Sequence, residues 1–427
     1  MTLALRTDRR LLRAGSRSSR YLLATIVAPT APARADRLPV NVALVLDRSG
    51  SMDGERKFGL AREAVQQSLA LLHPEDRFTL VVYDDSVDVL APAVAATPEA
   101  KRLALSRLDE VGPRGSTDLH GGWMAGATQI GAGLRDDAVT RALLLTDGLA
   151  NHGITEPGAL AGKAAELRRF GVATSTFGVG TDFDERLLRD LAHEGGGNFY
   201  FVETPAQISD LLTSELGEAL EVVARDVVLH LTLPAGADAE CLGRQRWTGG
   251  RDDELHVHLG DLSSAQELAV VVRIRFPEGS ADDATSVRAR LSDRDGSLDA
   301  SSVICEWRYA DDAANDAQPR DVVVDREVAA LYAARARAEA TEANRRGDLN
   351  GARRVLERTA DRIRGYARRD PAIEAIHRSL REDVDRYGSE VMSARQLKVA
   401  FATAESYGKG RGPDGKARRH RPPGGSP

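Results

Sequence analysis

This sequence of 427 residues has little of what marks several large classes of protein. It contains only two cysteines, Cys241 and Cys305, which lie in no C-x-x-C pattern and have no metal-ligating residues clustered around them. We therefore expect two buried or unpaired thiols, although the spacing leaves a disulfide between them open.

Charge of one sign and long apolar runs are also scarce. The formal net charge is only -6, so nucleic acid is not an expected partner. No apolar run approaches the length that spans a bilayer, and the glycine-rich stretches match no Walker or dinucleotide fingerprint. With 42% hydrophobic and 29% charged residues, the composition is typical of a globular protein, and the length suggests two or three domains.

The amino terminus permits two interpretations. Arg9-Arg10, the apolar stretch Tyr21–Val27 and the small residues of Ala33-Arg34-Ala35 together imitate a secretory signal. The apolar stretch is short and rich in β-formers, however, which favours a strand that stays in the mature protein. We therefore predict a cytoplasmic protein. The alternative is a secreted or periplasmic one, in which residues 1–35 are a signal peptide.

From residue 39 to 222 the sequence alternates short apolar strands with amphipathic helices. Nearly continuous apolar strands indicate burial on both faces, as in a parallel sheet covered by helices. This predicts an α/β domain with a doubly wound, mostly parallel, six-stranded, Rossmann-like sheet. The expected strands are 40–46, 78–83, 87–91, 142–146, 173–179 and 198–202. The expected helices are 57–72, 98–108, 119–132, 157–169, 185–192 and 205–219.

The most informative motif, Asp47-Arg48-Ser49-Gly50-Ser51, directly follows the first of these strands. Mg²⁺ and Mn²⁺ prefer oxygen ligands, which Ser49 and Ser51 can supply directly and Asp47 directly or through water. An ordinary strand-to-helix turn is the alternative, because Asp and Ser cap helices well.

Two further polar residues favour the metal site. Thr117 stands at the start of an expected helix, and Asp147 follows another buried strand. In doubly wound sheets, ligands bind outside the carboxyl ends of the strands. We therefore expect the motif, Thr117 and Asp147 to meet at one edge of the sheet.

The order D-x-S-x-S, then T, then D resembles the von Willebrand factor A domain and its metal-ion-dependent adhesion site. The resemblance implies that Ser49, Ser51 and Thr117 bind the metal directly, while Asp47 and Asp147 hold it mostly through waters. The implied metal is Mg²⁺, or Mn²⁺ or Ca²⁺ in its place. It also implies an open coordination position that an Asp or Glu of a protein partner fills.

The rest of the chain is different in character. Residues 223–312 show the alternation of an antiparallel β-sandwich, to which residues 1–38 are expected to add at least one strand, so that the α/β domain is inserted between sandwich strands. Bacterial relatives of the calcium-activated chloride channel and inter-alpha-trypsin inhibitor heavy chain type are similar in this combination. Residues 320–407 predict a helical hairpin or bundle, and residues 408–427 a disordered basic tail.

These features favour a non-enzymatic scaffold or adaptor that binds a partner through the metal. One alternative is a Mg²⁺-dependent hydrolase or phosphotransferase using Asp47 and Asp147. It lacks a convincing general base, since His120 and His152 are expected on the surface. A secreted adhesin that uses the same site is the other alternative.

Overall fold

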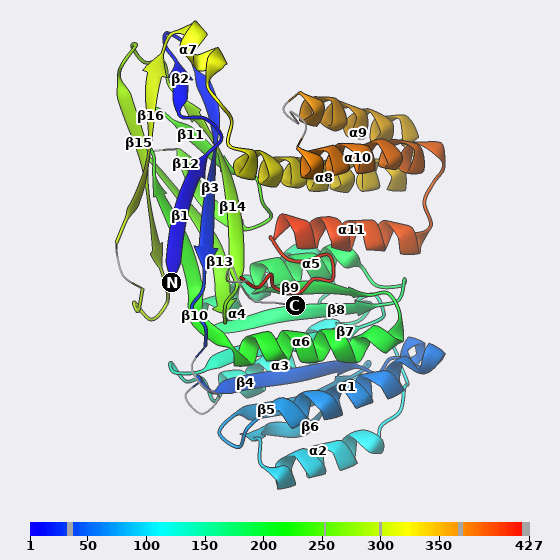
Figure 1. The fold of residues 1–427 in the computed structure, drawn as a ribbon. Helices are drawn as coiled ribbons and strands as arrows, with labels where there is room; N and C mark the ends of the chain where they lie inside the picture. The colour runs from blue at the N-terminus through cyan, green and yellow to red at the C-terminus, as the bar shows by residue number, and fades with distance from the viewer. Residues whose placement is uncertain (32–36, 252, 299–300, 366–369, 421–427) are drawn as a thin grey trace. The chain divides into compact units, whose positions relative to one another are not determined.

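The computed structural model describes residues 1–31, 37–251, 253–298, 301–365 and 370–420. The chain divides into two compact units (Figure 1). One is Ala31–Val222, and the other combines Met1–Thr30 with Val223–Pro427, so the first unit is inserted in the second. The segment Ala33-Arg34-Ala35, which imitates a cleavage site, lies outside the described residues.

The sheet of the inserted unit has the strand order β6-β5-β4-β7-β8-β9. β6 pairs antiparallel with β5, and the other neighbours pair in parallel. The predicted doubly wound, mostly parallel, six-stranded sheet is thus confirmed. Its strands are β4 (Val40–Asp47), β5 (Arg77–Tyr83), β6 (Val87–Ala95), β7 (Val139–Thr146), β8 (Val172–Val179) and β9 (Gly196–Val202).

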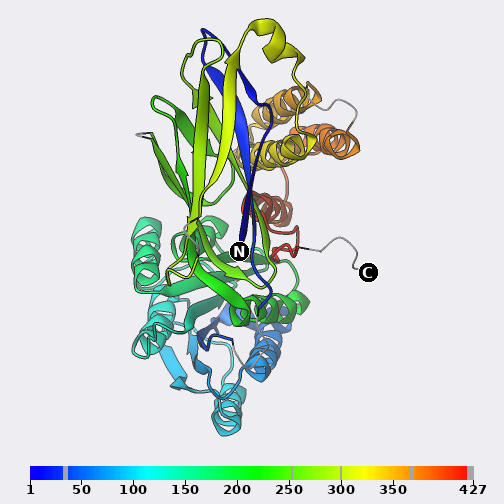
Figure 2. The ribbon, with the colours of Figure 1, turned by 60° about the vertical axis from the view of Figure 1, so that its left-hand side comes forward.

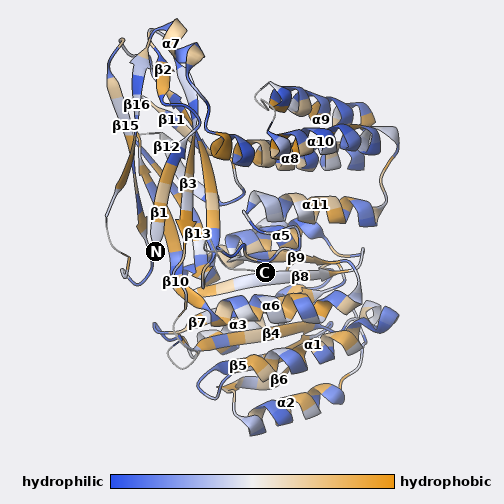
Figure 3. Cartoon of the chain, in the orientation of Figure 1, coloured by the Kyte–Doolittle hydropathy of each residue, from blue (hydrophilic) through white to orange (hydrophobic). Residues whose placement is uncertain are grey.

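Helices cover both faces of this sheet. Apolar side chains of α1, α2 and α6 form one core with the sheet, and α3 lies against the opposite face of β4. Every residue of β4 and β7 is buried, and β4 is almost continuously apolar in Figure 3. The helices are α1 (Lys57–Leu71), α2 (Pro98–Asp109), α3 (Leu119–Gly131), α4 (Pro157–Arg169), α5 (Glu185–Glu194) and α6 (Ile208–Leu220), with 3-10 helices η2 (Gly50–Arg56) and η3 (Pro205–Gln207).

Two glycines let α3 approach the sheet closely. Gly122 and Gly126 are four residues apart and therefore share one face of the helix. A Cβ atom on Gly122 would lie 2.3 Å from Cγ of Tyr83, and one on Gly126 would lie 2.5 Å from Cγ2 of Val45. Both neighbours are fully buried strand residues that have no room to move away.

A buried carboxylate ties α6 to three strands. Glu215 is 0% exposed, and its Oε1 accepts hydrogen bonds from Nη1 of Arg141 at 2.8 Å and from Oγ of Ser175 at 2.6 Å. Its Oε2 accepts hydrogen bonds from Asn198 and Tyr200. The network satisfies a charge that burial would otherwise make very costly.

The second unit contains a β-sandwich of two sheets, ordered β1-β3-β14-β11 and β12-β13-β10-β15-β16-β2. Antiparallel pairing predominates, as predicted: β1–β3, β3–β14, β14–β11, β12–β13, β10–β15 and β15–β16 are antiparallel, whereas β2 runs parallel to β16. The strands are β1 (Thr2–Thr7), β2 (Leu11–Arg13), β3 (Ser18–Val27), β10 (Val222–Thr232), β11 (Asp238–Cys241), β12 (Arg246–Arg251), β13 (Glu254–Ser263), β14 (Glu267–Phe276), β15 (Ala284–Ser292) and β16 (Val303–Ala310).

The apolar segment near the amino terminus lies inside this sandwich. β3 pairs with β14 from Val27 opposite Glu267 to Ser18 opposite Phe276, and β1 lies on its other side (Figures 1 and 2). Its residues Leu22 and Ile26 are fully buried in the sandwich core. The stretch that resembles the core of a signal peptide is therefore a central strand of a folded sheet.

The predicted carboxyl-terminal helical region is confirmed. A tight turn joins α8 (Val322–Arg345) to α9 (Leu349–Arg364). In this turn Gly347 has a φ of +76°, and Asp348 accepts a hydrogen bond from the backbone N–H of Gly351 at 2.8 Å. Among the described residues, no helix has both the length and the apolar character that crossing a membrane requires. The helices are α7 (Asp312–Ala317), α8 (Val322–Arg345), α9 (Leu349–Arg364), α10 (Pro371–Ser389) and α11 (Ala394–Gly408).

The prediction of a disordered basic tail over residues 408–427 is wrong for residues 408–420. The backbone of Glu267 donates a hydrogen bond to the carbonyl of Arg418 at 2.8 Å, and that of His420 donates to Ala265 at 2.8 Å. Arg411 is 7% exposed and donates to the carbonyl of Gly415. Tertiary hydrogen bonds thus order a segment whose composition alone suggests disorder. Residues 421–427 lie outside the described part.

Both cysteines are free thiols and buried, so the expectation of unpaired cysteines is confirmed. Burial raises the pKa of Cys241 to about 11 and that of Cys305 to about 11. Thiols in this state are poor nucleophiles at neutral pH.

The close approach of α3 predicts that Gly126→Ala lowers the free energy of unfolding by about 1–3 kcal/mol, because the added methyl group overpacks against Val45. Urea denaturation measures this. Gly131→Ala is the matched control in the same helix: its Cβ meets nothing within 4 Å, so it should leave stability unchanged or raise it by up to about 1 kcal/mol. Equal stability of the two variants would contradict the packing.

The buried network predicts a larger effect for Glu215→Ala, a loss of about 3–5 kcal/mol, because the change leaves the Arg141 guanidinium buried without its carboxylate. The control is Asp210→Ala, an exposed acidic residue in the first turn of the same helix, which should cost less than about 1 kcal/mol. Thermal or urea denaturation distinguishes the two. Similar losses for both variants would mean that the network adds little stability.

Candidate metal centre

Two aspartates meet at the carboxyl edge of the sheet because the strands before them are neighbours. β4 pairs in parallel with β7, with Leu46 opposite Leu145, so Asp47 and Asp147 emerge at the same edge. Both are 0% exposed. Oγ1 of Thr146 donates a hydrogen bond to Oδ2 of Asp47 at 2.6 Å, which holds the first carboxylate in place.

The turn after β4 brings the serine hydroxyls to these carboxylates. The backbone N–H of Ser49 donates to Oδ1 of Asp47 at 2.7 Å, and the hydroxyl oxygens of Ser49 and Ser51 lie 3.1 Å apart. Ser51 then donates a hydrogen bond to Oδ1 of Asp147 at 2.6 Å. Ser49 is the N-cap residue of η2 but makes no side-chain capping hydrogen bond. The alternative of an ordinary capping turn therefore does not account for the serine hydroxyls.

Thr117 approaches the same place from the start of α3. Asp118 caps that helix by accepting from the N–H of Gly121, and the N–H of Thr117 donates to Oδ1 of Asn151 at 3.0 Å. A Cβ atom built on Gly148 would lie 3.2 Å from Oγ1 of Thr117 and 3.9 Å from Oγ of Ser51. The structure thus brings together all five residues singled out from the sequence.

The oxygen spacing suits a small hard cation. Two oxygens that bind one Mg²⁺ at 2.0–2.1 Å and at right angles lie about 3 Å apart. The 3.1 Å distance between the hydroxyl oxygens of Ser49 and Ser51 is of this size. Hydroxyl and carboxylate oxygens are the ligand types that Mg²⁺ and Mn²⁺ prefer. Ser49 is 2% exposed whereas Ser51 is exposed, so the cluster opens to solvent on one side.

Burial makes the negative charge at this site costly. Burial raises the pKa of Asp47 to about 6, and the negative charge of Asp147 acts in the same direction. Hydrogen bonds from Thr146 and Ser49 oppose the shift. A cation among these oxygens would remove much of the cost.

Lys57 also touches the site and was not singled out from the sequence. It is the first residue of α1, and its ammonium Nζ lies 2.6 Å from Oδ2 of Asp147. The side chain is only 12% exposed. A lysine after a metal motif carries no distinctive pattern, and only the packing of η2 and α1 reveals that it reaches the carboxylate.

A second buried acid braces the loops around the site and was also missed. Asp84 directly follows β5, whereas Asp47 is the last residue of β4, and Oδ2 of Asp84 lies 3.0 Å from Nε of Arg48 and 2.7 Å from Nε of Arg114. Although burial acts to raise it, hydrogen bonds from Arg114 and Ser86 and the charge of Arg48 hold the pKa of Asp84 below its ordinary value. Its place at the end of a buried strand is a signal that could have identified it.

A protein-family model and several known proteins match part of this chain. A protein-family model described as the von Willebrand factor type A domain matches residues 41–214. The uncharacterised protein YfbK of Escherichia coli is 29% identical over 196 residues, which are 45% of this chain and 34% of YfbK. Human inter-alpha-trypsin inhibitor heavy chain H4 is 30% identical over 173 residues, 39% of this chain and 18% of the relative. The chain thus spans well under half of the length of these two relatives.

Solved structures show the same fold. A von Willebrand factor type A protein from Catenulispora acidiphila superposes with a TM-score of 0.68 at 20% identity, covering 84% of this chain and 85% of that one. The ArnB paralog VWA2 from Sulfolobus acidocaldarius gives 0.56 at 17% identity, covering 92% and 99%. Domains of this family are commonly metal-dependent protein-interaction modules. By motif, family match and fold, this chain carries a von Willebrand factor type A domain at residues 41–214.

Proposed function

We propose that this protein is a non-enzymatic, divalent-metal-dependent protein-binding module that serves as a scaffold or adaptor. The observation that carries the proposal is the convergence of the Ser49, Ser51 and Thr117 oxygens beside Asp47 and Asp147 at one open edge of the sheet. A carboxylate from an Asp or Glu of the partner protein would complete the metal shell.

The proposed division of roles follows from ligand charge. Ser49, Ser51 and Thr117 are the direct ligands, and Asp47 and Asp147 act mostly through water. Because hydroxyls carry no charge, a bound Mg²⁺, Mn²⁺ or Ca²⁺ keeps an excess of positive charge toward the open side. That excess favours an incoming carboxylate over water or a neutral group.

The surroundings support docking rather than hydrolysis. His152 lies five residues after Asp147 in the sequence; its side chain is 57% exposed, and its Nδ1 lies 3.7 Å from Oδ2 of Asp118, the cap of α3. Lys57 is held against Asp147 and serves as a counter-charge in this arrangement. The cytoplasmic location expected from the sequence stays a prediction.

The proposal predicts that Thr117→Ala weakens Mn²⁺ binding by at least about tenfold, the effect of losing one oxygen ligand of a charged group. Isothermal titration calorimetry of the full chain measures the affinity. Partner recovery on the immobilised protein should fall to the level seen with EDTA. Thr117 is only 3% exposed, but the change removes just two heavy atoms, so the free energy of unfolding in EDTA should fall by no more than about 1–2 kcal/mol.

Thr128→Ala is the matched control, since Thr128 is an exposed threonine within α3. It should bind Mn²⁺ and the partner as the wild type does. Equal partner recovery with Mn²⁺ and with EDTA would show that the metal plays no part in binding and would end the proposal.

Substitution of Lys57 should change the Mn²⁺ affinity in the opposite direction. Its ammonium lies 2.6 Å from Asp147, so it repels a dication bound at the same carboxylate. Lys57→Met should therefore raise Mn²⁺ affinity about tenfold, which corresponds to about 1.4 kcal/mol of relieved repulsion. Lys163→Met, which removes a half-exposed ammonium from α4, should leave the affinity unchanged. Calorimetric titration with MnCl₂ compares the two, and weaker binding by Lys57→Met would contradict the repulsion.

A further inference from the structure

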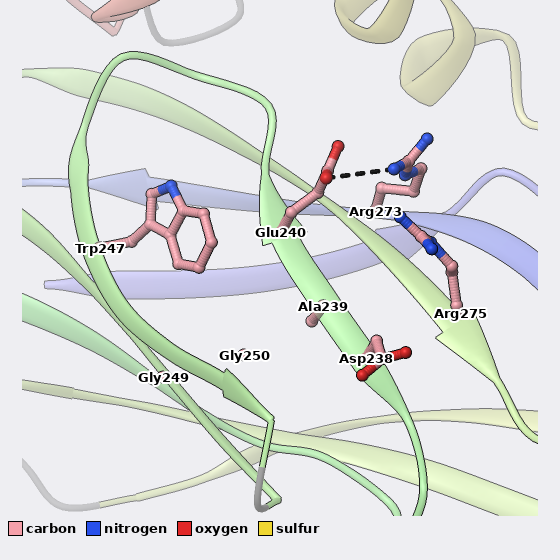
Figure 4. Close-up of a pocket in the computed structure, with 8 residues that line it drawn as sticks. All are labelled: Asp238, Ala239, Glu240, Trp247, Gly249, Gly250, Arg273 and Arg275. Carbon is pink, nitrogen blue, oxygen red and sulfur yellow. Dashed lines mark ion pairs between the residues drawn. The ribbon is translucent and has the colours of Figure 1, made fainter.

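A pocket of about 320 Å³ opens at the edge of the β-sandwich. None of the residues that line it belongs to the candidate metal centre. β11 ends the four-stranded sheet and β12 ends the six-stranded sheet, and residues of both strands and of β14 line the pocket. Figure 4 shows the indole of Trp247 on one side and the charged side chains of β11 and β14 on the other. The volume lies at the lower end of the range for small-ligand sites.

The aromatic wall of this pocket is exposed and held in position. Trp247 is 38% exposed, whereas the other two tryptophans, Trp123 and Trp307, are 0% and 2% exposed. A Cβ atom on Gly250 would lie 3.2 Å from the Trp247 ring and 2.4 Å from the carbonyl oxygen of Ala239. Gly250 has a φ of +93°, so the backbone and the close contact both require glycine. The bulge at Gly249 and Gly250 thus packs against the indole ring of Trp247 and leaves the ring exposed.

The opposite wall carries paired charges of both signs. Asp238 lies opposite Arg275 and Glu240 opposite Arg273 in the register of β11 and β14. Nη2 of Arg273 is 3.1 Å from Oε2 of Glu240, and Arg275 is exposed. Among the residues that line the pocket, these two carboxylates and two guanidinium groups balance in charge. Arg335 of α8 also lies near Glu240, with Nη1 3.8 Å from Oε1.

We propose that this pocket binds a neutral saccharide of one or two rings. An anion would meet the two carboxylates and the negative face of the indole, and a cation would meet the two guanidinium groups. Sugar hydroxyls both donate and accept hydrogen bonds, so they can donate to Asp238 and Glu240 and accept from Arg275. The apolar C–H face of the ring would lie on Trp247. The inference concerns the sandwich alone and does not depend on the metal centre.

The test uses the full chain and three neutral disaccharides as probes: maltose, cellobiose and N,N′-diacetylchitobiose. Because Trp247 is the exposed tryptophan among the three, a bound sugar should change the intrinsic fluorescence saturably. Saturation-transfer NMR should show the contact at the C–H protons of the same sugar. No saturable response to any of the three would overturn the proposal.

Variants assign the binding to this pocket. Trp247→Ala should weaken the NMR-detected affinity at least about tenfold, and Arg275→Ala about tenfold. Thr248→Ala is the matched control. Thr248 follows Trp247 in β12 and is paired with His256, so its side chain points to the opposite face of the strand, and this variant should bind the sugar as the wild type does. Affinity that survives Trp247→Ala, or tighter binding of glucuronate or glucosamine than of glucose, would also overturn the proposal.

Discussion

The parallel pairing of β4 with β7 is the constraint on which the α/β domain and its site depend. Both strands are buried on both faces, so an apolar pattern by itself specifies their register weakly. The hydrogen bond from Thr146 to Asp47 joins the strands at their carboxyl ends. A slip of one residue would turn Thr146 away from Asp47 and would separate the two carboxylates that the site needs. The candidate site can therefore form only when β4 and β7 pair in this register.

The buried acids of this domain are stabilised in different ways. Glu215 and Asp84 each have a guanidinium partner within hydrogen-bonding distance. Asp47 accepts hydrogen bonds from uncharged groups, and Asp147 has the ammonium of Lys57. The Asp47–Asp147 pair is thus less fully compensated than the other two acids. An added divalent cation gains the most free energy at such a place.

Much of the fold could be predicted because its signals are local. Continuous apolar strands and amphipathic helices define the α/β sheet, and a motif at strand ends indicates where Asp47, Thr117 and Asp147 meet. Lys57 could not be predicted, because its contact depends on η2, where Glu55 and Arg56 have φ values of 53° and 58°. Such left-handed residues redirect the chain without a sequence signature.

The sandwich shows the same limit in another form. β2 has only three residues, and the outward-facing charges of β15 and β16 make those strands resemble loops. Residues 409–420 are ordered by hydrogen bonds to a turn more than a hundred residues earlier, such as that of His420 to Ala265. Composition describes a segment in isolation, whereas these elements are stabilised by distant neighbours.

The insertion of one domain in another has a consequence for the order in which the protein is made. β3 pairs with β14, and Val27 meets Glu267 across the whole inserted domain. At roughly 5–20 residues per second, a ribosome synthesises β3 at least about 10 s before its partner. The strands of the α/β sheet lie between Val40 and Val202, so this domain can fold on the nascent chain. Until β14 is made, the edge of β3 that pairs with it has no partner, so the sandwich can close only after the whole α/β domain has been synthesised.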